Sequence, residues 1–86
     1  MKMVKIFTSD TCPRCPQAKE LGACLKGEGI EVRFYDVGTA DGLAEAALNR
    51  VLATPSILVV DGESETVIRD WRGVLPLEGE VLHALG

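Results

Sequence analysis

The stretch Cys12-Pro13-Arg14-Cys15 places two cysteines, with two residues between them, near the start of the chain. A short apolar run at residues 3–7 and a polar turn at residues 8–11 precede it. A segment with helical periodicity follows it. Two cysteines with this spacing, at a point where a strand is followed by a helix, favour thiol–disulfide chemistry. Whether they can act in this way depends on the scaffold that the other residues provide.

The length and composition of the chain fit one small domain covering residues 1–86. Apolar residues make up 47% of the sequence, which is enough for a compact core. The formal net charge of −4 argues against a nucleic-acid partner. No run of about 18 apolar residues indicates a transmembrane helix, and the first seven residues are too short an apolar segment for a signal peptide. We therefore expect a cytoplasmic monomer with no membrane partner.

The chain has three cysteines, an odd number, whereas a framework of structural disulfides normally uses an even one. Cytosolic thiols are also mostly reduced, so the cysteines are expected to be reactive groups or ligands. The third one, Cys24, lies three residues after Leu21 on the apolar face of the predicted helix. We expect it to be a buried structural thiol.

Hydrophobic periodicity and turn residues predict seven elements. The first two strands are joined through a helix and should be parallel, whereas Asp61-Gly62 predicts a hairpin between the last two. This pattern indicates an α/β fold with a mixed sheet. In the second helix, the side chains expected to face inward are Leu43, Ala46, Ala47, Leu48 and Val51. Strands are expected at residues 3–8, 30–37, 57–60 and 66–71, and helices at residues 12–27, 43–52 and 76–85.

With the first helix beginning at Cys12, this residue is the N-cap, and Pro13 takes the first helical position, where a missing N–H costs nothing. The free N–H groups and the dipole of the helix would then favour a Cys12 thiolate, and Arg14 adds a positive charge. Cys12 is therefore the expected nucleophile. Cys15, one turn further and less exposed, is the expected resolving cysteine, and Pro16 should loosen the first turn.

The predicted reaction is a disulfide exchange between these two cysteines and a substrate. The Cys12 thiolate attacks a substrate disulfide and forms a mixed disulfide. Cys15 then displaces the reduced product, and a Cys12–Cys15 disulfide remains. No cofactor is needed beyond this redox-active pair.

A second feature lies at Thr54-Pro55, between the second helix and a buried strand. Proline at this place cannot donate to a sheet and suits a bend, and bonds that precede proline are where cis peptides occur. On these residues alone, a simple helix terminator explains the pair equally well.

With both features in place, the whole chain resembles the thioredoxin and glutaredoxin superfamily, in particular its small glutaredoxin-like thioredoxins. The resemblance implies a minimal thioredoxin fold of order β-α-β-α-β-β-α, with a four-stranded mixed sheet flanked by three helices. It also implies a cis bond into Pro55, and a substrate strand that pairs with the backbone of Thr54. The substrate-binding residues would be Pro13, Arg14, Thr54, Pro55 and Gly73.

The resemblance also implies the partners, which are protein disulfides and an electron-donating disulfide reductase. The chain departs from the thioredoxin pattern at Thr11 and at Pro13-Arg14. Ile6 stands where thioredoxins carry a buried acid that accepts a proton from the second cysteine. The segment Trp71-Arg72-Gly73-Val74-Leu75 offers one glycine and no acid, whereas glutathione-dependent glutaredoxins carry two glycines and an acid there. Protein disulfides are therefore expected as substrates, and glutathione is not.

Three alternatives remain at this point. A small copper chaperone also places two cysteines after its first strand, and two thiolates suit Cu(I). A zinc site from Cys12, Cys15, Cys24 and His83 is chemically conceivable, but Cys24 is expected to face the core. A redox-inert adaptor would have no use for the intact cysteine pair.

Overall fold

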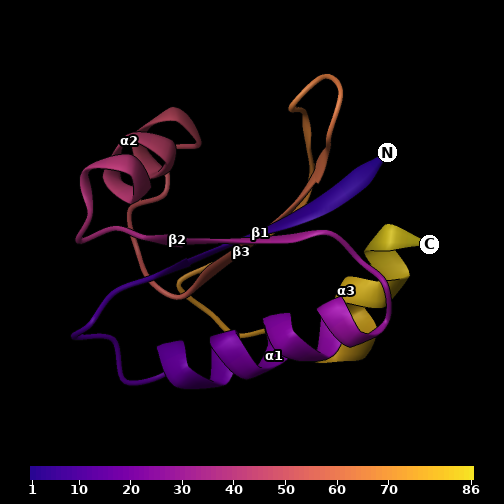
Figure 1. Cartoon of the computed structure of the whole chain (residues 1–86), viewed down its shortest axis with the longest axis horizontal. Coiled ribbons are helices and arrows are strands. Elements are labelled where there is room, and N and C mark those ends of the chain that lie inside the picture. Colours follow the sequence, from indigo (N-terminus) through magenta and orange to yellow (C-terminus); the bar gives the residue numbers. More distant parts are fainter.

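The computed structural model describes all residues, 1–86, as a four-stranded sheet with helices on both faces (Figure 1). Helices α1 and α3 cover one face, and α2 covers the other. The observed order confirms the predicted order of strands and helices. The elements are β1 (Lys2–Thr8), α1 (Cys15–Gly27), β2 (Val32–Asp36), α2 (Ala40–Leu48), β3 (Ser56–Asp61), β4 (Val67–Arg72) and α3 (Glu78–Leu85).

The strands are arranged in the order β2-β1-β3-β4. β1 pairs with β2 in parallel and with β3 antiparallel, and β3 pairs antiparallel with β4, so the sheet is mixed as predicted. β1 is central and buried from Met3 to Thr8, which agrees with its apolar side chains on both faces. β2 lies at an edge and does not show the clean alternation that its sequence suggests: Val32 is buried, but Phe34 on the same face is 40% exposed. No helix is long and apolar enough to span a bilayer.

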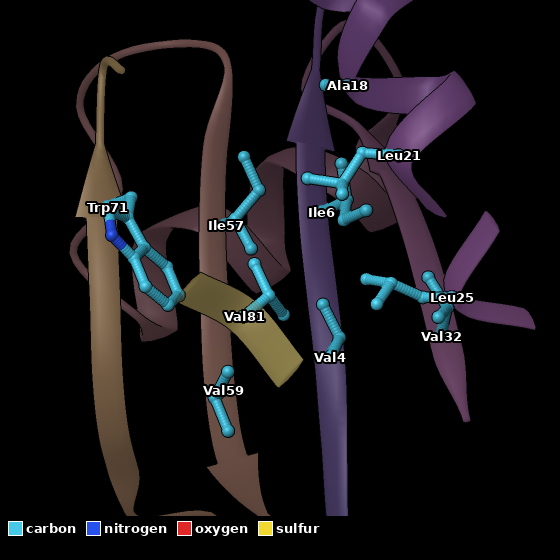
Figure 2. Close-up of a cluster of buried hydrophobic side chains, with 10 residues drawn as sticks. All are labelled: Val4, Ile6, Ala18, Leu21, Leu25, Val32, Ile57, Val59, Trp71 and Val81. Atoms are coloured by element: carbon cyan, nitrogen blue, oxygen red, sulfur yellow. The ribbon is translucent and has the colours of Figure 1, made fainter. Parts of the chain in front are cut away.

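The larger hydrophobic cluster fills the space between the sheet and the helices α1 and α3 (Figure 2). Val4 and Ile6 of β1 lie at its centre, and Val81 of α3 packs between β1 and β3. Trp71 closes the cluster on the β4 side. The ten buried members are Val4, Ile6, Ala18, Leu21, Leu25, Val32, Ile57, Val59, Trp71 and Val81.

The smaller cluster lies on the opposite face, under α2. Phe7 is fully buried there, and its ring stacks on Tyr35 with 5.2 Å between the centroids. Lys5 lies on the same face of β1 and is also buried, with 2% of its surface exposed. The buried apolar members are Met3, Phe7, Ala46, Val51, Leu58 and Val60.

The start of α1 differs from the prediction. The helix begins at Cys15 with Arg14 as its N-cap, so Cys12 is not the N-cap and Pro13 is not the first helical residue. Pro16 instead falls in the first turn, where backbone N–H groups have no intrahelical partner. It therefore fits this helix start and does not loosen it. Both prolines suit the beginning of a helix, and periodicity alone did not distinguish them.

Cys24 is exposed, so the prediction of a buried thiol is wrong. Helix α1 packs through a face that includes Gly22, where an added Cβ would lie 2.4 Å from the Phe34 ring. This close approach turns Cys24 toward solvent, although Leu21 and Leu25 on either side of it are buried.

Helix α2 begins and ends earlier than predicted. The Thr39 side chain caps it by accepting a hydrogen bond from the N–H of Gly42, and the helix ends at Leu48. Gly42 and Ala46 form the packing face, because an added Cβ on Gly42 would lie 1.8 Å from the Asp36 carbonyl oxygen. Leu43, Ala47 and Leu48 were expected to face inward but are exposed, Leu43 at 60% and Leu48 at 79%. Pro55 does not end the helix, which stops six residues before Thr54-Pro55.

The last helix also starts later than predicted. Pro76 precedes the N-cap, Leu77, and does not belong to the first turn. The Glu80 side chain accepts a hydrogen bond from the N–H of Leu77, with 3.3 Å between the atoms. An acidic first turn suits the positive end of the helix dipole.

Candidate functional site

The two cysteines of the motif are joined by a disulfide between the end of β1 and the start of α1, with 5.3 Å between their Cα atoms. Cys12 is partly exposed, whereas Cys15 is buried with 2% of its surface exposed. This difference agrees with the predicted order of exposure. An incoming molecule therefore reaches the Cys12 sulfur first.

A pocket of about 350 Å³ brings the motif together with a distant loop. The peptide bond between Thr54 and Pro55 in this loop is cis, as the resemblance implied. Each of the five residues predicted to bind substrate lines the pocket beside Cys12, and Cys15 lies behind it. The lining residues are Cys12, Pro13, Arg14, Thr54, Pro55 and Gly73.

The cis-proline loop is held in place by the end of β4. The N–H of Gly73 donates to the carbonyl oxygen of Pro55 at 2.9 Å, and the Ser56 hydroxyl donates to the carbonyl of Ala53 at 2.6 Å. Arg72 adds a clamp, because its guanidinium donates to the carbonyls of Asn49 and Arg50, each at 3.0 Å. These bonds fix the wall of the pocket that faces the cysteines.

Ser9 contacts the motif and the facing loop at once, and sequence reasoning missed it. Its N–H lies 3.5 Å from the Cys15 sulfur and donates to it, and its carbonyl accepts from the N–H of Cys12 at 3.3 Å. Its hydroxyl lies 3.3 Å from that of Thr54. In the sequence, Ser9 is one of four polar residues of a turn, so no local signal distinguishes it.

The backbone of Thr54 is unusual because it has no internal partner. Neither its N–H nor its carbonyl makes a hydrogen bond within the protein. Thr54 is only partly buried, and it lines the pocket beside Cys12. Unpaired backbone groups at such a position can bind an extended segment of another chain.

A larger pocket of about 510 Å³ lies away from the cysteines. At its base, the ammonium group of Lys5 contacts the carboxylates of Glu45 at 2.6 Å and Glu65 at 2.8 Å. Burial disfavours the charged amine, but the hydrogen bonds to both carboxylates outweigh it, so the pKa of Lys5 is raised. The hydrogen bond from Lys5 lowers the pKa of Glu65. Glu65, in the loop after β3, thus has a structural role through this ion pair.

Comparison with known proteins identifies the family. No family model matches the chain. A protein of Archaeoglobus fulgidus named "Probable Thioredoxin" is 34% identical over 84 residues, which cover 85% of this chain and 92% of the relative. The chain belongs to the thioredoxin and glutaredoxin superfamily. A glutaredoxin-like protein of Clostridium pasteurianum, from a rubredoxin operon, is 36% identical over 63 residues, or 70% of this chain and 77% of the relative.

Solved thioredoxin structures share this fold. Thioredoxin O2 of Arabidopsis thaliana superposes with a TM-score of 0.77 at 15% identity, covering 99% of this chain and 72% of the other. A thioredoxin-like protein of Clostridium perfringens gives 0.76 at 19% identity, covering 100% and 71%. With this family membership and the Cys12–Cys15 disulfide, the protein is a thiol–disulfide oxidoreductase.

The structure shows where the residues that depart from the thioredoxin pattern lie. Ile6 is fully buried and belongs to the cluster under α1 and α3, so this position supplies no acid. Arg14 is exposed at the rim of the pocket and makes no ion pair. The Ser9 N–H is the one hydrogen-bond donor to either sulfur.

The zinc alternative finds no support in the geometry. No group of three or more His, Cys, Asp or Glu side chains is arranged to hold a metal ion. Cys24 and His83 are both exposed, and neither lines the pocket of the motif.

Proposed function

We propose that this protein reduces disulfide bonds in other proteins through Cys12 and Cys15. One observation carries the proposal: the accessible Cys12 shares an open pocket with the cis-proline loop, while Cys15 is buried behind it. Cys12 is the nucleophile and Cys15 the resolving cysteine. Electrons come from a disulfide reductase or another dithiol. No bound cofactor is needed, and the protein works as a monomer in the cytoplasm, where thiols stay reduced.

The binding of the substrate uses the backbone of Thr54. An extended client segment would pair with the free N–H and carbonyl of this residue, as a peptide does when it adds a strand. This pairing brings the client disulfide to the Cys12 sulfur across the pocket. Pro13, Arg14 and Gly73 complete the walls.

The surroundings of the pocket favour a protein as substrate. An apolar hollow of about 300 Å³ adjoins it and shares Thr54 with it. Leu52 in this hollow is 97% exposed, and an apolar client side chain can cover it. The segment after Gly73 lacks the second glycine and the acid of glutathione-dependent glutaredoxins, which argues against glutathione. The hollow is lined by Val37, Leu43, Val51, Leu52, Ala53 and Thr54.

The test is reduction of insulin disulfides with dithiothreitol as the electron source. The wild type should accelerate the reaction, whereas Cys12→Ser and Cys15→Ser should not. Cys24→Ser is the matched control, because this exposed cysteine lies outside the pocket, and it should keep full activity. Absence of turnover by the wild type, together with stoichiometric binding of Cu(I), would instead support the copper carrier.

A further inference from the structure

Ser9 makes contacts with both cysteines of the motif and with Thr54 in the cis-proline loop. Its N–H donates to the Cys15 sulfur, its carbonyl accepts from Cys12, and its hydroxyl pairs with that of Thr54. We propose that Ser9 is the positioning residue for the second half of the exchange: its N–H stabilises the Cys15 thiolate, and its bond to Thr54 keeps that N–H in place. The inference rests on the proposed exchange through Cys12 and Cys15.

The second half of the exchange needs a charged sulfur in a buried place. A thiolate with 2% of its residue surface exposed loses hydration, and this disfavours the charged form. Ile6 stands where the thioredoxin pattern has a buried acid, and its side chain cannot accept the proton of Cys15. A hydrogen bond from an N–H is stronger to a thiolate than to a neutral sulfur. The Ser9 N–H therefore favours the state of Cys15 that reacts.

No charged side chain of the site takes this role. Asp10 and Arg14 in the same turn are exposed, and so is Lys19 on α1; none of the three bonds a cysteine sulfur. The facing wall of the pocket consists of Thr54, Pro55 and Gly73, which carry no ionisable side chains. The N–H of Ser9 is thus the hydrogen-bond donor to the Cys15 sulfur, and it acts beside the positive end of α1, where Cys15 is the first residue.

The hydroxyl of Ser9 extends this effect to the other side of the pocket. Ser9 and Thr54 are 45 residues apart in the chain, and their hydroxyl oxygens are 3.3 Å apart. The bond ties the polar turn to the loop whose backbone would receive the client. Loss of the hydroxyl frees the turn, so that the N–H is aimed at the sulfur for a smaller fraction of the time.

The step that Ser9 assists is balanced within the two cysteines and the client. The Cys15 thiolate attacks the Cys12 sulfur of the mixed disulfide between Cys12 and the client. The Cys12–Cys15 bond forms, and the bond from Cys12 to the client sulfur breaks. The client sulfur leaves as a thiolate with the electron pair and takes a proton from water, while the two cysteines become oxidised.

The test follows the two steps separately in one experiment. Reduced full-length protein, with Cys24→Ser as the background, is mixed with one equivalent of dithiobis-nitrobenzoate. Attack by Cys12 releases the first thionitrobenzoate, and attack by Cys15 on the resulting mixed disulfide releases the second. Both rates are recorded by absorbance across a range of pH. No client protein is required, so the result is independent of insulin reduction.

A set of variants distinguishes the effect of the Ser9 hydroxyl from other effects of a substitution. Ser9→Ala should slow the second release about two- to tenfold at neutral pH, the effect of one hydrogen bond, and move its pH profile to higher pH. The first release should be unchanged. Ser9→Thr, which keeps the hydroxyl, should restore the parent rate. Ser64→Ala is the matched control, because it removes a hydroxyl pair with Thr66 far from the cysteines.

Three results would overturn the inference. These are an unchanged second release in Ser9→Ala, an equal slowing of both releases, and a parent protein that shows no second release. If Ser9→Ala slows only the second release as expected, but the parent protein fails to reduce insulin, the proposed function is contradicted and the role of Ser9 is still supported.

Discussion

The N–H of Gly73 bonds to the carbonyl of Pro55 and so joins the end of β4 to the cis-proline loop. Gly73 has a φ of +73°, and an added Cβ would lie 3.1 Å from the Cβ of Ala53. Both facts favour a residue without a side chain. The shape of the candidate site thus depends on one glycine outside the cysteine motif.

Gly73→Ala should destabilise the protein by about 1–2 kcal/mol, the cost of a left-handed conformation for a residue with a Cβ, and should slow insulin reduction. Urea unfolding measures the first effect. Gly79→Ala in α3 is the control, because an added Cβ there meets nothing within 4 Å. It should be neutral or stabilise the helix by up to about 1 kcal/mol. Equal unfolding free energies for the two variants would contradict the explanation.

The buried Lys5 provides a second prediction, on stability. Glu45→Gln removes a charged partner of a buried amine and should cost about 1–3 kcal/mol. Lys5→Met removes the buried charge itself and should be nearly neutral. Glu31→Gln, in the exposed pair with Arg33, should change the free energy of unfolding by less than about 1 kcal/mol. A large loss in Lys5→Met alone would show that the ion pair is a net stabiliser.

The ion pair of Glu65 with Lys5 should make the free energy of unfolding depend on pH. Its pKa is lowered in the folded state from the usual 4.5, so its contribution is present above pH 4.5 and lost as the pH falls through the lower folded value. The pKa of Lys5 is raised above 10.5, so its contribution is lost only at still higher pH. In Glu65→Gln, the free energy of unfolding should therefore fall less at acidic pH than it does in the wild type.

Thermal unfolding measured from about pH 2 to about pH 7, a range that includes the usual glutamate pKa, checks this. Glu63→Gln, which removes a carboxylate without an ion pair from the same loop, controls for net charge. An identical pH profile for Glu65→Gln and the wild type would be inconsistent with the ion pair.

The apolar hollow beside the site predicts a difference between substrates. Leu52→Ala should raise KM for insulin and leave the reaction with dithiobis-nitrobenzoate unchanged, because only a protein client can cover this side chain. It should barely affect stability, since Leu52 is 97% exposed. Leu48→Ala, equally apolar but at the other pocket, is the control. Equal effects of Leu52→Ala on both substrates would show that the apolar hollow does not contribute to binding of a protein client.

Local patterns predicted the order of the elements, because each strand and helix carries its own periodicity and its own turn residues. The resemblance to the superfamily predicted the cis bond into Pro55, which lines the same pocket as Cys12. Local patterns failed where packing decides: Gly22 turns Cys24 outward, and Gly42 shifts the packing face of α2 away from Leu43.

The contacts of Ser9 and Lys5 were missed for another reason. Ser9 meets Thr54 across 45 residues of sequence, and Lys5 meets Glu45 and Glu65 across 40 and 60 residues. Neither residue belongs to a local motif. Such contacts follow only from the topology that places β1 at the centre of the sheet.

Trapping of the mixed disulfide tests the central claim most directly. Cys15→Ser cannot complete the exchange, so it should hold a disulfide-bearing client covalently, one client per protein, and mass spectrometry of the digested complex should place the bond at Cys12. Cys12→Ser should trap no client in the pocket. A complex linked through Cys24, or no complex with Cys15→Ser, would contradict the assignment of Cys12 as the nucleophile.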